Sequence, residues 1–427
     1  SPGACVHYAV ARPRPAVRFG RPSRILIARN VVGESRTGGP PRPNHKRKGR
    51  MILRLVSFFG LLVMLLLAWT LSERRREVPW RLVFWGTGLQ FAIGAIMLPT
   101  RVKGVAFAVT AKLTDVLTAA SLEGAGFVFG DLAKNPSYGA LVAFQVLPVI
   151  IFVSALSGIL YHFHVIQAVV RAVSWIMRRT LKTSGAETLG AALLILLGIE
   201  SMTAIRHYIK DMTRSELCTV MTAFMATIAG SVMVVYAGFG AEPGHLLTAS
   251  LMSAPAAIVV SKIMVPERDQ PATAGVLRVT LPAESRNFVD AAAQGASQGL
   301  SLALNVGAML IAFLGLVYVA DLLFGAVTGY TFKEAVGWFF RPFALAMGAP
   351  PADAAALGQL LGTKTVLNEF LAYADLQHAE NLSDRGRMIA TYALCGFANP
   401  GSLGILIAGM TSSAPDRRKD IVQLGFR

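Results

Sequence analysis

Three short stretches interrupt apolar sequence with residues that can bind a polar solute. They read LLGIESMTAI (196–205), GTKTVLNEFLAY (362–373) and CGFANPGSLGI (395–405), and each combines glycine with Glu, Asn or Ser. A charged side chain near the centre of a bilayer costs at least ~2.5 kcal/mol, so by default it marks a functional site. We therefore expect the polar side chains of these stretches to form a binding site.

Helices that break at membrane depth are one way in which transporters build polar sites. The breaks expose N–H groups at half-helix N-termini and bare carbonyls at the other ends. Carboxylate and amide groups hydrogen-bond to hydroxyls, which suits a neutral polyhydroxy solute. Four side chains could converge on such a solute: Glu200, Glu369, Asn399 and Ser402. The alternative is a structural contact, such as Lys364 with Glu369, that only holds helices together.

Two other classes of protein stay open at this point. Glu200 and Glu369 could serve an intramembrane enzyme, and the same fold could act as a non-transporting receptor or gate. The sequence contains no nucleophile elbow, zincin helix or Walker A loop. Its three cysteines, Cys5, Cys218 and Cys395, lack the CxxC or Cys/His spacing of a metal site. We therefore expect no enzyme, no cofactor and no certain metal site.

The composition indicates an integral membrane protein. Of 427 residues, 54% are hydrophobic and 15% are charged, whereas a soluble domain has about 25% charged residues. The formal charge of +17 is concentrated in residues 1–50, which contain 12 Lys/Arg and one acid, Glu34. This Pro-, Gly- and Arg-rich tail predicts disorder rather than a nucleic-acid-binding arm. Met51 directly precedes the first apolar run, and we expect the natural protein to begin there.

Apolar runs of about 20 residues predict membrane spans. They are Ile52–Leu71, Arg81–Leu98, Leu141–Tyr161, Leu217–Phe239, Leu246–Val265, Leu300–Leu323 and Met388–Met410, the last interrupted at NPGS. Amphipathic segments that can lie in the interface plane are Val105–Glu123, Val165–Thr180 and Tyr330–Met347. Two further apolar segments hold Glu, Lys or Asn near their middle and contain Gly, which fits re-entrant hairpins: Ser184–Met212 and Pro351–Gln377.

Lysine and arginine in short loops predict the orientation. The arginine-rich loop SERRREVPWR (72–81) and the loop DRRKD (416–420) are expected to be cytoplasmic. The loop AGFGAEPGH (237–245) has neither Lys nor Arg and is expected to be external. We expect the membrane to be the inner membrane of a bacterium.

Many stretches resemble the concentrative nucleoside transporter family, in order, over nearly all of residues 51–427. They include EGAGFVFGDL, TSGAETL, MTRSELCTVMTAFMATIAGSV, LGTKTVLNEFLAYADL and IATYALCGFANPGSLGI. The resemblance implies a nucleoside importer driven by cation symport, with H+ or Na+ as the coupling ion. It also implies an all-α polytopic bundle with two re-entrant hairpins of opposite orientation, interfacial helices, and a scaffold around a moving transport domain in a homotrimer.

The resemblance also implies how a nucleoside is bound. The glutamate of the Asn-Glu-Phe motif, Glu369 beside Asn368, hydrogen-bonds the ribose, together with Asn399 and Ser402. Phe397 lines the same pocket. The residues expected to contact the nucleobase depart from the family pattern. Glu200 and Ser201 are the expected contacts with the base, but Ile199 replaces a glutamine. We therefore expect the ribose to dominate recognition.

The expected cation site departs from the family pattern too. The family places an asparagine where this chain has Leu194, whereas Thr227 keeps a hydroxyl. Thr227 and backbone carbonyls near Leu197 and Ile228 form an incomplete oxygen shell for sodium. A proton needs only a buried carboxylate, so Leu194 favours proton coupling.

The expected division of the chain follows from these segments. Its parts are a non-native tail (1–50), scaffold helices (51–183), the first hairpin with the following spans (184–265), a linker, span and interfacial helix (266–350), and the second hairpin with a broken span (351–427). The family continues beyond this point into one more helix, which this chain is expected to lack.

Overall fold

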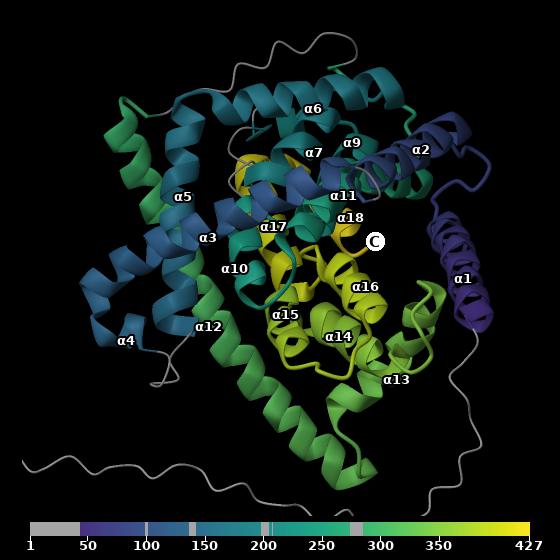
Figure 1. Cartoon of the computed structure of the whole chain (residues 1–427). Helices are drawn as coiled ribbons and strands as arrows, with labels where there is room; N and C mark the ends of the chain where they lie inside the picture. Colours follow the sequence, from purple (N-terminus) through teal and green to yellow (C-terminus); the bar gives the residue numbers. More distant parts are fainter. Residues whose placement is uncertain (1–42, 99–100, 136–141, 198–204, 207, 274–284) are drawn as a thin grey trace, which may run out of the picture. The chain divides into compact units, whose positions relative to one another are not determined.

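The fold is known from a computed structural model. It describes residues 43–98, 101–135, 142–197, 205–206, 208–273 and 285–427, and within these ranges every regular element is a helix (Figure 1). Residues 49–427 form one compact unit. The predicted all-α fold class is confirmed.

The helices follow the chain in three groups. The first contains α1 (Pro43–Thr70), α2 (Trp80–Met97), α3 (Arg101–Phe129), α4 (Asp131–Lys134), the π-helical η2 (Val142–Val146), α5 (Leu147–His162) and α6 (Val165–Leu181). The second contains α7 (Gly185–Leu197), α9 (Arg214–Ala226), α10 (Gly230–Gly238), α11 (Pro243–Met264) and α12 (Phe288–Thr328). The third contains α13 (Phe332–Ala346), α14 (Ala354–Val366), α15 (Glu369–Gln377), α16 (Asp384–Leu394), α17 (Pro400–Ser413), η4 (Pro415–Arg417) and α18 (Arg418–Gly425).

Within the described residues, six helical stretches are long and apolar enough to cross a membrane. They are Met51–Thr70, Val102–Phe129, Val142–His162, Arg214–Gly238, Pro243–Met264 and Phe288–Thr328. The chain is therefore a multi-pass membrane protein. The expected span Arg81–Leu98 forms α2, which is not among the six because Arg81 and Gln90 lower its hydropathy. The segment Val105–Glu123, which we predicted to lie in the interface plane, is part of α3. By length and composition α3 is also a candidate to cross the membrane.

The first helix begins earlier than the sequence predicts. We predicted disorder over residues 1–50, but α1 starts at Pro43, so the prediction is wrong for residues 43–50. Proline suits the first position of a helix, and lysine and arginine are good helix formers. The apolar run from Met51 supplies the helix that these basic residues extend.

The predicted span Leu217–Phe239 lies almost wholly within the candidate span Arg214–Gly238, but it is not one unbroken helix. Helix α9 ends at Ala226 and α10 starts at Gly230, and Thr227 between them is extended. The Thr227 hydroxyl donates a hydrogen bond of 2.8 Å to the carbonyl of Ala223. A side chain that bonds a backbone carbonyl in this way competes with the helical ladder, which helps to end the helix here.

Helix α5 packs side by side with the N-terminal half of α12 (Figure 1). Gly158 of α5 faces the backbone of Ala291, and Gly295 and Gly299 of α12 face the backbone of α5 around Ser154 and Ile151. A Cβ atom at any of these glycines would overlap the facing backbone. Glycine is therefore required for this close approach.

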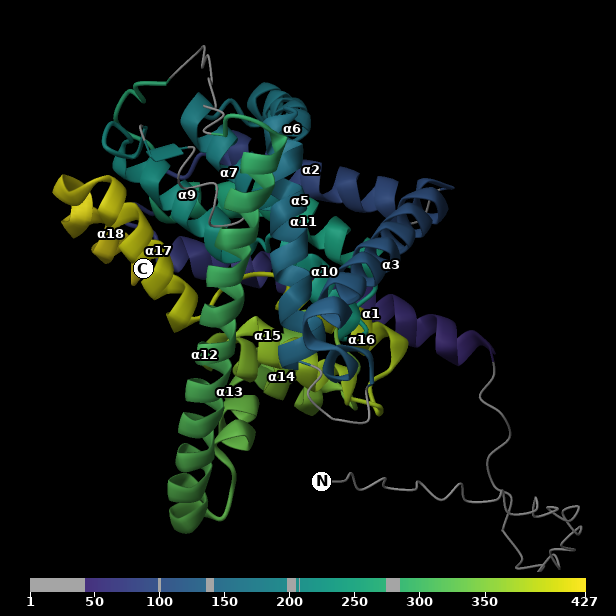
Figure 2. The same ribbon diagram turned by 90° about the vertical axis from the view of Figure 1, so that its left-hand side faces the viewer.

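The two loops predicted to be cytoplasmic lie at the same end of the molecule. Arg214, at the start of α9, pairs with Glu73 of the first loop at 3.1 Å and with Asp420 of α18 at 3.3 Å. Arg427 also pairs with Glu73, at 2.9 Å. Helix α18 lies against α17 (Figure 2). These contacts place the two loops on the same side of the protein, while the cytoplasmic location of that side stays a prediction.

Candidate functional site

Two helix breaks bring the predicted binding residues together. Helices α14 and α15 are separated at Leu367 and Asn368, and α16 and α17 are separated by residues 395–399. The Asn368 side chain accepts a hydrogen bond of 2.9 Å from the amide of Leu371, and the Asn399 side chain accepts one of 2.8 Å from the amide of Ser402. Each asparagine is therefore the N-cap of a half-helix.

Glu369 is the buried centre of this site. Its side chain is 6% exposed. Oε2 accepts a hydrogen bond of 2.8 Å from Nδ2 of Asn399, and Oε1 accepts one of 2.8 Å from the hydroxyl of Tyr236. A carboxylate has about four lone-pair positions, so further acceptor positions are left for a ligand. The N-termini of α15 and α17 also favour negative charge at this point.

Tyr236 of α10 is a site residue that the sequence reasoning missed. It is fully buried and stacks on Tyr373 with ring centroids 4.3 Å apart and planes at 19°. Tyr373 in turn donates a hydrogen bond of 2.8 Å to the carbonyl of Thr391 in α16. A tyrosine in the apolar stretch GSVMVVYAG needs a hydrogen-bond partner for its hydroxyl. This requirement could have identified Tyr236 as a site residue from the sequence.

Lys364 does not make the structural contact with Glu369 that we considered. Its ammonium instead donates a hydrogen bond of 2.8 Å to the carbonyl of Ala393, in the last turn of α16. A cation at this position satisfies a carbonyl that the helix leaves without an internal partner. Lys364 therefore holds the end of α16 directly before the break that leads to Asn399.

Phe397 lies inside the second break. Its ring is half-buried and tilted against Phe224 of α9, with centroids 5.6 Å apart. Its carbonyl accepts a weaker hydrogen bond, at 3.4 Å, from the Asn399 side chain. The segment that carries Phe397, Asn399 and Ser402 is thus fixed by its own capping contacts.

The predicted base contacts and the predicted cation-site residues do not lie around Glu369 among the residues that the structure describes. Glu200 and Ser201 lie outside the described residues. Leu197 is the last residue of α7. Thr227 and Ile228 are both buried in the break between α9 and α10, where helix carbonyls lose their internal partners.

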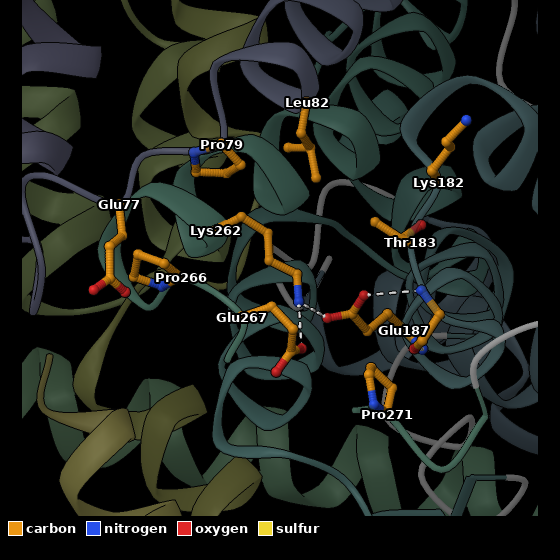
Figure 3. A pocket seen from close by; sticks show the side chains of 11 residues that line it. Glu77, Pro79, Leu82, Lys182, Thr183, Glu187, Lys262, Pro266, Glu267 and Pro271 are labelled. Carbon is orange, nitrogen blue, oxygen red and sulfur yellow. Dashed lines mark hydrogen bonds and ion pairs between the residues drawn. The ribbon is translucent and has the colours of Figure 1, made fainter. Parts of the chain in front are cut away.

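A second buried polar cluster lies between α7 and α11. The Lys262 ammonium pairs with Glu187 and, at 3.0 Å, with Glu267 (Figure 3). It also donates a hydrogen bond of 2.9 Å to the Ser215 hydroxyl. A cavity of about 330 Å³ adjoins it and is also lined by Glu77. The sequence reasoning missed the cluster, although a lysine inside an apolar helix is a signal for one.

One ammonium, that of Lys262, pairs with the two carboxylates of this cluster, Glu187 and Glu267. Lys262 and Glu187 are almost completely buried, and an isolated charge there would be costly unless paired. Among the residues that the structure describes, no group of three or more His, Cys, Asp or Glu side chains could hold a metal ion. The pairing of Lys262 with Glu187 joins the start of α7 to the end of α11.

Family models match three consecutive parts of the chain. Residues 59–132 match the N-terminus of a "Na+ dependent nucleoside transporter", residues 143–243 match a "Gate: Nucleoside recognition" model, and residues 245–427 match the C-terminus of the same transporter. Together the matches include both helix breaks of the site.

Curated relatives match most of the chain. The mouse protein "Solute carrier family 28 member 3" is 40% identical over 403 residues, which cover 87% of this chain and 56% of that protein. Rat "Sodium/nucleoside cotransporter 2" is 36% identical over 398 residues, covering 88% of this chain and 60% of the relative. The chain thus spans little more than half the length of these curated relatives.

The structure of CNTnw in an inward-facing substrate-bound state aligns with a TM-score of 0.81 at 34% identity. The alignment covers 87% of this chain and 92% of that one. A variant of CNTnw in an outward-facing state aligns with a TM-score of 0.83, also at 34% identity, over 88% of this chain and 93% of that one.

Proposed function

Because the chain belongs to the concentrative nucleoside transporter family, we propose that it imports nucleosides across the cell membrane by cation symport. The observation that carries the proposal is the pairing of Glu369 with Asn399 at the first turns of two half-helices. A buried carboxylate held by two donors can accept hydrogen bonds from the ribose hydroxyls, and each bond to a charged group contributes roughly 1.5–3 kcal/mol.

The other residues have supporting roles in this proposal. Asn368 caps α15 and so fixes Glu369 in its first turn. Asn399 orients the carboxylate, while Ser402 and Phe397 complete the ribose side of the pocket. Glu200 and Ser201 are proposed contacts for the base. This assignment makes the protein a transporter, and neither an enzyme nor a receptor.

The sequence alone favours the proton, but the family names favour sodium, so we propose sodium as the coupling ion and keep the proton as the alternative that the same experiments test. Two of the three matching family models carry sodium in their names, as does the rat relative reported above. The break between α9 and α10 offers the Thr227 hydroxyl and backbone carbonyls, the oxygen ligands that a hard cation prefers. Leu194 brings no oxygen, so we expect weak sodium binding with half-saturation at a high concentration.

We also propose a homotrimer in the cell membrane. The exposed apolar side chains of α12, among them Leu304, Ile311 and Val327, offer a surface for subunit contacts. The mass of the purified complex in detergent, after subtraction of bound detergent, tests this assembly. The bacterial inner membrane stays our prediction for the location; the curated relatives reported above come from mouse and rat.

Competition for uptake tests the substrate class. We expect unlabelled nucleosides to compete with radiolabelled uridine in proteoliposomes, and free nucleobases to compete at least tenfold less well. The reason is that Ile199 cannot hydrogen-bond a base edge, whereas Glu369 can bind ribose hydroxyls. Equal competition by bases would contradict ribose recognition. Saturable nucleoside binding without uptake would favour the receptor.

A further inference from the structure

Helix α6 has one buried face and one exposed face, and the exposed face, called the outer face below, is partly apolar. Its inner face is buried through residues that include Val170 and Met177. On the outer face, Trp175 is 57% exposed and Ile176 44%, and Val165 and Val169 are similarly exposed. Exposed apolar side chains of this size on one helix face indicate contact with a membrane.

Cations accompany these apolar side chains. Residues 165–182 contain Arg171, Arg178, Arg179 and Lys182 and no acid. The guanidinium of Arg179 lies 5.9 Å from the ring centre of Trp175. A pocket of about 340 Å³ is lined by Trp175, Arg178, Arg179, Lys182 and Thr183. Its charged lining is wholly cationic, so it is complementary to an anion.

The position of this pocket in the fold favours the cytoplasmic interface. Lys182 and Thr183 also line the cavity that contains Glu77 of the arginine-rich loop 72–81 (Figure 3). The acids that line that cavity contact other cations: Glu77 pairs with Arg268 at 2.6 Å, and Glu187 and Glu267 share Lys262. In Figure 3 the Lys182 ammonium points away from Lys262.

Lys182 also has a backbone conformation that its residue type disfavours. It follows the last turn of α6 with φ of +53° and ψ of +36°, in the left-handed region. Glycine is the usual residue at this position, and other residue types are strained there. A lysine here places an ammonium beside Arg178 and Arg179 at a structural cost, and such a site motivates a functional hypothesis.

We propose that the outer face of α6 binds the headgroup of an anionic phospholipid of the cytoplasmic leaflet. Arg179 and Lys182 would contact the phosphate, and Trp175 would lie beside the glycerol and upper acyl chain. Cytoplasmic leaflets carry anionic lipids, and tryptophan is enriched at this depth. A lipid fits better than a free phosphate because exposed apolar side chains adjoin the cations. The inference depends on the membrane location and not on the transported substrate.

Native mass spectrometry of the full chain in detergent tests the proposal. We expect dioleoyl phosphatidylglycerol to bind at least tenfold more tightly than dioleoyl phosphatidylcholine. Arg179→Gln with Lys182→Gln should weaken phosphatidylglycerol binding on the order of 30-fold, as expected for the loss of two cations at an anionic surface. The matched control is Arg418→Gln with Lys419→Gln, which removes two exposed cations from α18 and should leave the preference unchanged.

Lys182→Gly separates binding from folding. It removes the ammonium and also relieves the left-handed backbone, so we expect weaker phosphatidylglycerol binding with an equal or higher melting temperature. An unchanged lipid preference in the Arg179/Lys182 variant, or an equal loss in the α18 control, would overturn the proposal. Displacement of the lipid by millimolar inorganic phosphate would overturn the choice of a lipid as the ligand.

Discussion

The side-chain amide of Asn399 donates a hydrogen bond of 2.8 Å to the carboxylate of Glu369, thirty residues earlier in the chain. Both residues lie at the start of a half-helix, so the bond joins two helix N-termini. Each N-terminus carries partial positive charge, which stabilises the buried carboxylate between them. The same arrangement leaves a polar, preorganised surface at the centre of an otherwise apolar region.

Glu369→Gln tests whether this carboxylate binds the substrate. Glutamine keeps the size but loses the charge-assisted hydrogen bonds, so we expect at least a tenfold loss of nucleoside uptake. The amount of protein in the membrane should not change. The control is Glu334→Gln in α13, an exposed helix-capping glutamate, which should transport normally. Normal uptake by the Glu369 variant would make this residue structural.

Tyr236→Phe removes one of the two donors to Glu369. An acceptor that loses its buried partner costs about 1–3 kcal/mol, and the carboxylate loses a contact that orients it. We expect the KM for nucleoside to rise roughly 5- to 150-fold in uptake assays. Tyr318→Phe, at an exposed tyrosine of α12, is the matched control. A KM like that of the unmodified protein would show that the hydroxyl does not position Glu369.

Thr227→Val tests the proposed ion site without changing the volume of the side chain. We expect the sodium concentration for half-maximal uptake to rise several-fold, while the maximal rate at saturating sodium changes little. The control is Thr110→Val in α3, a buried threonine whose hydroxyl also bonds the carbonyl four residues earlier. Uptake that depends on the pH gradient and is insensitive to both substitutions would favour coupling to the proton over coupling to sodium.

Lys262→Met tests the structural role of the second polar cluster. It leaves Glu187 buried without its partner, and breaking a buried pair in this way costs about 3–5 kcal/mol. The apparent melting temperature in detergent should fall by several degrees, and adding Glu187→Gln should restore part of the loss. Lys333→Met, which breaks an exposed pair with Asp375 at 3.4 Å, should change it little. Equal shifts in the two single variants would argue against a buried tie.

The sequence predicts local breaks better than long-range partners. The motifs around Glu369 and Asn399 combine glycine, proline and capping residues with apolar flanks, and such signals act over a few residues. The hydrogen bonds of Tyr236 with Glu369 and of Lys364 with Ala393 join separate helices. No periodicity encodes such pairs. The break after α9 was missed because Thr227 lies in sequence that is apolar enough to span unbroken.

Uptake of radiolabelled uridine into proteoliposomes at a clamped membrane potential tests the central proposal most directly. A sodium gradient at uniform pH should drive accumulation above the external concentration, and the recovered uridine should be chemically unchanged. A pH gradient without sodium should drive none. Accumulation under the pH gradient alone would replace sodium with the proton. No accumulation under either gradient, with the protein folded and correctly inserted, would contradict nucleoside symport.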